Sequence, residues 1–317
     1  MAKTKPTQPM KISWRSIIFL VLILLAGIVV APQVSELKSS ILLVTDARVE
    51  WLVLAFFCVF GAVLSSAPVY RFLSFHKLRT RDVSLVQIAG MFVNRLLPAG
   101  IGGIGLNIRY LYKNGHTPAE ATATTVANNT LTGFGHMLLV FCALGIMSHT
   151  DDVAPQISVS LTLIFVACVS ILLVVLVIYN LKSAFADKMR QFILAASKSL
   201  STYKKRPKDA AMALFFAMFN TSFHTAAVYA SMQALDVDLS PFVALLALTG
   251  GIVLATATPT PGGVVGSEAG ISAVLILYGV DTPTAIASAL SYRIVSYWLP
   301  LIPGLVAFYY IQKKKLI

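Results

Sequence analysis

Long apolar runs, separated by short polar stretches, constrain this 317-residue chain more than any other feature. A helix needs about 20 predominantly apolar residues to cross the hydrocarbon core of a bilayer. Only 12% of the residues are charged, whereas soluble domains carry about 25%, so the pattern predicts an all-α, polytopic transmembrane bundle. The expected spans are residues 16–31, 51–70, 119–147, 157–179, 210–232 and 284–311, with shorter apolar segments at 242–258 and 269–277.

The positive charge of the chain, +12 in total, flanks these apolar runs. Most of the 25 Lys and Arg residues lie at the N-terminus and in residues 71–81, 182–208 and 313–315. Because basic loops stay on the cytoplasmic side, we expect a multi-pass protein of the cytoplasmic (inner) membrane with both termini in the cytoplasm. The partly amphipathic stretch 182–208 should lie along that surface. We expect residues 1–317 to form one domain and to bind no nucleic acid.

Two segments rich in glycine and proline interrupt the apolar sequence. Residues 98–107 read PAGIGGIGLN and residues 259–268 read PTPGGVVGSE, so one Pro and two Gly fall at matching places. Such residues interrupt a helix, and broken backbone at membrane depth must be buried in protein or line a wet cavity. Each segment is therefore predicted to turn back inside the protein as a broken, re-entrant helical hairpin.

Charges around the two segments indicate opposite orientations. Basic residues, Arg81 and Lys113, flank the first segment, whereas aspartates flank the second. The first hairpin should therefore enter from the cytoplasmic face and the second from the external face. Half-repeats of roughly 51–147 and 210–312 would then form an inverted repeat, a pattern typical of transporters.

Three formal charges remain at membrane depth once the loops are assigned: Arg95, Glu268 and Arg293. A charge at the bilayer centre costs about 3 kcal/mol or more, so such residues usually mark a pathway or a paired site. The two arginines would hold an anionic group such as a lipid phosphate. Glu268 would orient an arginine or exchange a proton. In the alternative interpretation, an Arg–Glu pair pins the hairpins together and binds no ligand.

Residues around these charges complete the candidate lipid-binding site. Helix starts after the glycines would present backbone N–H groups to the same anion. Asn128 occupies the position in the first half that corresponds to Arg293 in the second. The full set is Asn94, Arg95, Pro98, Gly102, Gly103, Arg109, Asn128, Pro261, Gly262, Gly263, Glu268 and Arg293.

Motifs of soluble enzymes are missing from the sequence. There is no Walker loop or HExxH motif, and the three cysteines lie in apolar runs without metal-like spacing. We expect no enzyme activity, catalytic residue, cofactor or metal. A membrane-embedded enzyme that modifies a lipid phosphate stays open as an alternative, with His136, His224 and Glu268 as its candidate general bases or nucleophiles. Tyr297 is predicted to be a packing or interface residue.

The paired motifs resemble those of the lysylphosphatidylglycerol synthase transmembrane-region family, also called flippase-like. Residues 94–103 (NRLLPAGIGG), followed by Arg109, resemble its first signature. Residues 259–268, followed by 289–293 (ALSYR), resemble its second. The resemblance extends over about residues 15–312.

This resemblance implies a lipid-translocating domain. In two-part relatives, a cytosolic synthetase attaches lysine to phosphatidylglycerol and the membrane part moves the product outward. This sequence has no such synthetase domain, so we expect a flippase without aminoacyl transferase activity. Its partner would be a membrane lipid with an anionic headgroup, either aminoacylated phosphatidylglycerol or a polyprenyl-phosphate-linked lipid. A non-catalytic partner of a lipid-modifying enzyme, contacting it through 182–208, is a further alternative.

Overall fold

The computed structural model describes residues 42–96, 101–147, 203–258 and 262–317, and the single positions 187, 194 and 260. All regular elements in these ranges are helical, which confirms the predicted all-α class. They are α3 (Val49–Leu73), α4 (Thr80–Leu96), α5 (Ile101–Lys113), α6 (Pro118–Met147), α9 (Pro207–Gln233), α10 (Pro241–Ala257), α11 (Gly266–Leu277), α12 (Thr282–Arg293), the π-helix η3 (Ile294–Trp298) and α13 (Leu301–Lys313).

Within the described residues, four helical stretches are long and apolar enough to cross a membrane. They are Val49–Leu73, Pro118–Met147, Pro207–Gln233 and the continuous run of α12, η3 and α13 over Thr282–Lys313. These match the spans predicted at 51–70, 119–147, 210–232 and 284–311. The spans predicted at 16–31 and 157–179, and most of the amphipathic stretch 182–208, lie outside the described residues.

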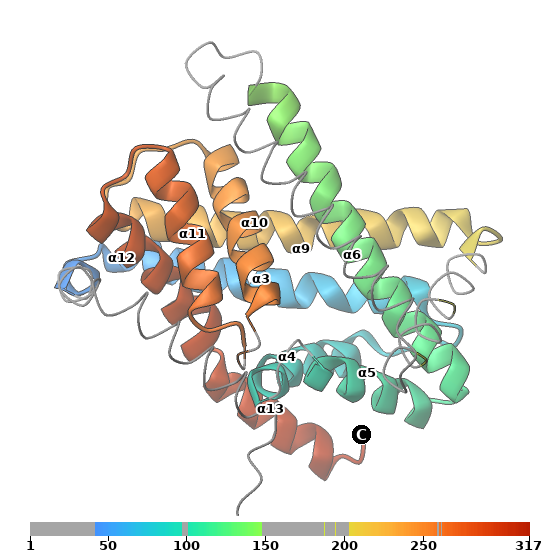
Figure 1. Cartoon of the computed structure of the whole chain (residues 1–317). Helices are drawn as coiled ribbons and strands as arrows, with labels where there is room; N and C mark the ends of the chain where they lie inside the picture. Colours follow the sequence, from blue (N-terminus) through green and yellow to red (C-terminus); the bar gives the residue numbers. More distant parts are fainter. Residues whose placement is uncertain are drawn as a thin grey trace, which may run out of the picture.

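Helices α3 and α9 lie side by side across the middle of the molecule (Figure 1). Aromatic rings fill the space between them: Phe72 stacks on Phe216 with ring centroids 5.9 Å apart. Gly61 lets the ring of Phe223 approach α3, because a Cβ at that position would lie 2.9 Å from the ring. Packing of this kind, rather than a hydrophobic drive from water, holds helices together in lipid.

The first broken segment forms the antiparallel pair α4 and α5. Near the break, the side chain of Asn94 accepts a hydrogen bond from the N–H of Gly103 at 2.6 Å. Farther along, Gln87 Nε2 donates to Asn107 Oδ1 at 2.8 Å, and Asn107 Nδ2 donates to the carbonyl of Gly103. These bonds satisfy polar groups that no water would reach in the bilayer interior. The predicted hairpin is present.

The second broken segment forms the antiparallel pair α10 and α11. Gly250 and Gly270 face each other so closely that a Cβ at Gly250 would lie 2.7 Å from the carbonyl oxygen of Gly270. Between the helices, Gly262 and Gly263 have φ angles of 65° and 64°, a conformation that favours glycine. This explains why the segment carries glycine at these positions. The inverted orientation of the two hairpins stays a prediction.

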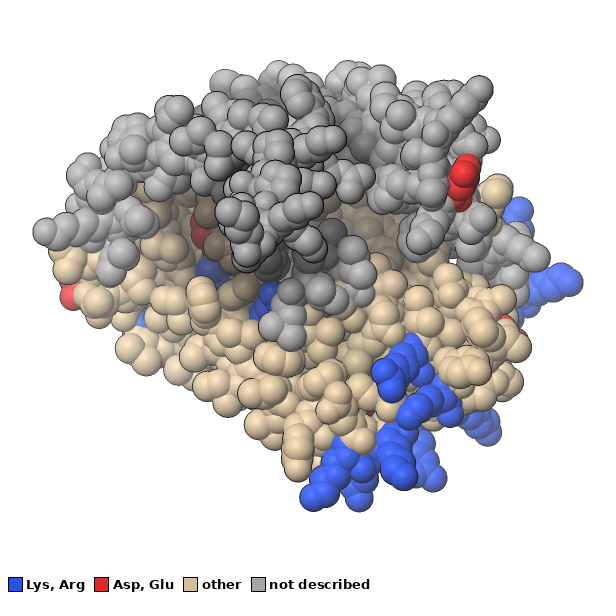
Figure 2. Space-filling view, turned by 60° about the horizontal axis from the view of Figure 1, so that its bottom comes forward, with Lys and Arg blue, Asp and Glu red and all other residues tan. Residues whose placement is uncertain are grey.

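Both ends of the first hairpin lie beside the C-terminal segment. Lys113 Nζ donates to the carbonyl of Ile317 at 2.7 Å, and Arg81 Nη2 donates to the Tyr310 hydroxyl at 3.5 Å. Lys and Arg side chains gather along one edge of the molecule (Figure 2). At another end of the bundle, Arg48 pairs with Asp236 at 2.5 Å and joins the start of α3 to the end of α9.

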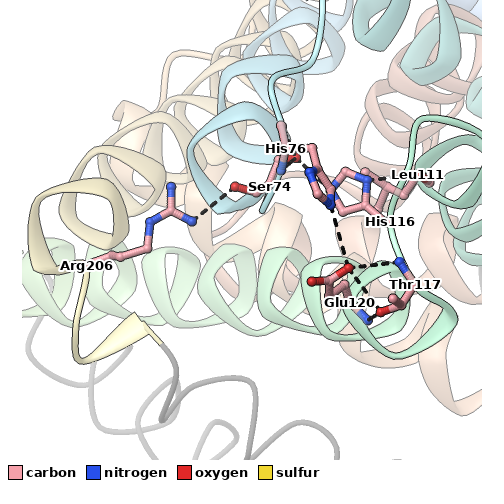
Figure 3. Close-up of polar contacts among 7 residues, drawn as sticks. All are labelled: Ser74, His76, Leu111, His116, Thr117, Glu120 and Arg206. Carbon is pink, nitrogen blue, oxygen red and sulfur yellow. Dashed lines mark hydrogen bonds and ion pairs between the residues drawn. The ribbon is translucent and has the colours of Figure 1, made fainter.

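A polar clasp, defined here as Ser74, His76, His116, Glu120 and Arg206, joins the end of α3 to the α5–α6 turn and the start of α9 (Figure 3). His116, 2% exposed, lies with Nε2 2.8 Å from Ser74 Oγ and Nδ1 3.0 Å from the Leu111 carbonyl. Arg206 Nη1 donates to the Ser74 carbonyl, and His76 pairs with Glu120 at 3.8 Å. Burial lowers the pKa of His116, and the hydrogen bond to Leu111 opposes that shift.

Replacing Gly270 by alanine should loosen the second hairpin, because the new methyl group would collide with the Gly250 carbonyl. We expect a loss of about 1–3 kcal/mol in stability, measured as a lower melting temperature in detergent. Gly133→Ala on α6 is the matched control, since a Cβ there meets nothing within 4 Å. Equal melting temperatures for the two variants would contradict the close packing of α10 on α11.

The clasp should weaken on acidification. The pKa of His116 in the folded protein lies below the value of about 6.5 for an unfolded chain, so the folded state binds fewer protons. Stability should therefore fall as the pH decreases below about 6.5. Melting temperatures measured between pH 8 and 5.5 test this. His116→Asn should flatten the slope of melting temperature against pH, whereas His76→Asn in the same clasp should keep it. An unchanged slope in His116→Asn would refute the assignment of the pH dependence to His116.

Candidate functional site

The three charged side chains predicted to lie at membrane depth meet at one aromatic ring. We call this set the arginine–tyrosine cluster: Arg95, Glu268, Arg293 and Tyr297. Arg95 lies in the last turn of α4 and Glu268 in the first turn of α11. Arg293 ends α12, and Tyr297 lies on the π-helix that follows. The three charges predicted from the sequence are therefore brought together by both broken hairpins and the last span.

Arg293 and Glu268 form a partly buried ion pair. Arg293 Nε lies 2.8 Å from Glu268 Oε1, and the two side chains are 10% and 19% exposed. Arg293 Nη2 also donates to the carbonyl of Gly262 at 3.1 Å. That carbonyl is at the tip of the second hairpin, where the left-handed conformation of the glycines turns the backbone. The pair thus fastens α12 to this tip.

Arg95 has a different environment, because its partners in the described part of the chain are neutral. Its Nε donates to the Tyr297 carbonyl at 2.9 Å, and its two terminal nitrogens donate to the carbonyls of Met91 and Ser296. Arg95 forms no ion pair with Glu268. The idea that one Arg–Glu pair pins both hairpins together is therefore wrong for Arg95: it contacts the last span instead.

The π-helix explains why carbonyl groups are available to Arg95. Proline has no N–H, so Pro300 cannot donate to the carbonyl of Ser296 four residues before it. The backbone widens here, and the N–H of Leu299 bonds the carbonyl of Ile294 at 2.9 Å, five residues back. Arg95 supplies the donor that Ser296 lacks. Single π-turns inside α-helices are frequent at functional sites.

Tyr297 connects the two arginines. The guanidinium carbon of Arg95 is 5.2 Å from its ring centroid and that of Arg293 is 4.5 Å away. The two cations are therefore no farther apart than the sum of these distances. The ring also occupies the space where a Cβ at Gly262 would lie. Cation–π contacts of this kind contribute about 0.5–2 kcal/mol each, and here they hold like charges close together.

Tyr297 is the residue of the cluster that the sequence interpretation missed, since it was expected only to pack or to lie at the interface. One signal was present: Tyr297 follows Arg293 by four residues, and residues four apart lie on the same face of a helix. Its contact with Arg95, about 200 positions away in the chain, had no such signal. The residue is 9% exposed, as expected for a side chain enclosed between two charged groups.

Other predicted site residues lie around the cluster or apart from it. Asn94 Oδ1 accepts a hydrogen bond from the N–H of Gly103, so this pair closes the first hairpin and that N–H is engaged within the protein. Gly102 packs against the carbonyl of Val93. Arg109 is exposed on α5, with no ion pair or hydrogen bond among the described residues. Pro98 and Pro261 lie outside the described residues.

Asn128 does not take the role in the first half that Arg293 has in the second. It is 8% exposed on α6 and donates to Asn129 Oδ1 at 3.2 Å. Its own Oδ1 is buried without a partner in the described ranges. None of its described contacts reaches the arginine–tyrosine cluster.

Both candidate histidines bond hydroxyl groups on other helices. His136 Nε2 lies 3.1 Å from Thr249 Oγ1 and links α6 to α10. His224 Nδ1 lies 3.1 Å from the hydroxyl of Tyr292 and links α9 to α12. No group of three His, Cys, Asp or Glu side chains suited to a metal ion occurs among the described residues. The guanidinium groups of Arg95 and Arg293 are hydrogen-bond donors of a kind that suits an anion.

No curated protein matches the chain. A family model described as the lysylphosphatidylglycerol synthase TM region matches residues 14–304, which includes both broken hairpins and the whole cluster. The chain is therefore a multi-pass membrane protein that belongs to the lysylphosphatidylglycerol synthase transmembrane-region family.

Proposed function

We propose that this protein is a flippase of the cytoplasmic membrane that moves a lipid with a phosphate-containing headgroup. The observation that carries the proposal is the charge of the arginine–tyrosine cluster. It contains two arginines and one carboxylate, and that carboxylate pairs with Arg293. Arg95 is left with neutral carbonyl partners in the part of the chain that the structure describes.

An unneutralised cation at membrane depth is costly, and such residues mark substrate pathways. A phosphate group would neutralise Arg95 and accept hydrogen bonds from either guanidinium. Each guanidinium has five N–H donors. The contacts described above engage three donors of Arg95 and two of Arg293, so both side chains keep donors for a shared anion.

The location of the cluster suits a lipid better than a soluble anion. It lies where the end of α4 and the tip of the second hairpin meet the last span, and broken backbone at membrane depth must line a cavity or be buried in protein. A headgroup could enter between the hairpins while its acyl or prenyl tails stay in the bilayer. The family description supports a substrate such as aminoacylated phosphatidylglycerol. Polyprenyl-phosphate-linked lipids carry the same phosphate chemistry.

An embedded lipid-modifying enzyme receives less support from the site. Its candidate bases, His136 and His224, each bond a hydroxyl on a neighbouring helix, and Glu268 bonds Arg293. A general base must reach the proton that it removes, and each of these side chains has one polar atom engaged in a contact between helices. A partner that docks a separate enzyme would depend on residues 182–208, most of which lie outside the described ranges.

Removing either cation should slow translocation. In proteoliposomes with a fluorescent phosphatidylglycerol, Arg95→Gln or Arg293→Gln should slow flipping at least about tenfold, because each loses a charge-assisted hydrogen bond of about 1.5–3 kcal/mol. The readout is chemical quenching of the outer leaflet. Arg79→Gln, an exposed cation outside the cluster, should flip at the wild-type rate. Wild-type protein that flips no faster than protein-free liposomes would end the proposal.

The aromatic ring gives a second test. Tyr297→Phe keeps the π face that both guanidinium groups contact and should retain most of the flipping rate. Tyr297→Leu removes that face and should reduce the rate by about the effect of one to two cation–π contacts, roughly tenfold. The same liposome assay compares them. Equal rates for the two variants would show that the ring only fills space.

A further inference from the structure

We propose that Glu268 sets the charge of the headgroup that the site accepts. This inference depends on the proposed anion site and adds a role for the carboxylate within it. The formal charges at membrane depth are Arg95, Arg293 and Glu268, which sum to one positive charge. A headgroup phosphate with a single negative charge, a phosphodiester, would make the occupied site neutral.

The geometry makes this carboxylate part of the anion site. Glu268 Oε1 lies 2.8 Å from Arg293 Nε, the same guanidinium that a bound phosphate would contact. Its other oxygen, Oε2, is buried and has no hydrogen-bond partner in the described part of the chain. The carboxylate is therefore held by one cation from one side. A second anion on that cation would feel its negative charge at short range.

Among the described residues, helices α10, α11 and α12 and the π-helix carry no charged side chain besides Glu268 and Arg293. Helix α10, which packs along α11, contains no titratable side chain. Helix α12 and the π-helix bring Tyr292, Arg293 and Tyr297 to this place. His224 contacts the Tyr292 hydroxyl. An imidazole is neutral at the alkaline pH of the binding test below, because its ordinary pKa is about 6.5. Glu268 is thus the carboxylate that decides whether the site has one or two net positive charges.

A phosphomonoester should bind poorly for the same reason. Above about pH 8 it carries two negative charges, since its second proton dissociates near pH 6. In the cluster it would leave one negative charge uncompensated in the bilayer interior, which is unfavourable. Selection between the two phosphate classes then follows from charge balance and does not require a contact with the rest of the headgroup.

Binding of two short-chain lipids to the full-length protein in detergent at pH 8.5 tests the proposal. The diester probe is dihexanoyl phosphatidylglycerol and the monoester probe is dihexanoyl phosphatidate. Wild type should bind the diester at least about tenfold more tightly. Glu268→Gln, with two net positive charges, should reverse the order. Glu120→Gln removes a carboxylate at the start of α6 and should keep the wild-type preference.

A double variant separates charge from folding. Arg95→Gln combined with Glu268→Gln restores a single net positive charge and should restore the preference for the diester. If neither probe binds wild type, the proposed anion site itself fails. If both probes bind and Glu268→Gln still prefers the diester, the anion site stands and the role of Glu268 is refuted. A double variant that prefers the monoester would also refute the role of Glu268.

Discussion

The low dielectric of the bilayer interior is the constraint on which the rest of this structure depends. Each polar group at that depth needs a partner from the protein, because water is absent. The chain satisfies this for its backbone through helices, and for its broken segments through side chains such as Asn94, which bonds Gly103. In the arginine–tyrosine cluster, Glu268 pairs with Arg293, and Arg95 contacts the Tyr297 ring as a cation in excess.

Glycine and proline residues allow the breaks in helix that form the arginine–tyrosine cluster. Close contact between Gly250 and Gly270 brings the two arms of the second hairpin together, and left-handed glycines turn its tip toward Arg293. In the last span, Pro300 removes a backbone donor and a π-turn forms before it. Arg95 then completes the hydrogen bonding of that turn. Breaks in regular helix thus create the partners that the arginines use.

Much of the fold could be predicted, because hydropathy and the positions of glycine and proline are local properties of a sequence. The four described long spans and both hairpins follow from them. The convergence of Arg95, Glu268 and Arg293 was predicted from the cost of intramembrane charge. Their separate partners were not predictable. Spacing along the chain carries no information on whether Arg95 meets Glu268 or the Ser296 carbonyl, and the role of Tyr297 depends on that choice.

A density map of the protein in a phosphatidylglycerol nanodisc tests the central claim most directly. The account predicts phosphate density within hydrogen-bonding distance of both Arg95 and Arg293, beside the Tyr297 ring, continuous with acyl-chain density that leads into the bilayer. The map would contradict the account if the cluster were well resolved with no amphiphile beside it and both arginines bonded only to protein groups.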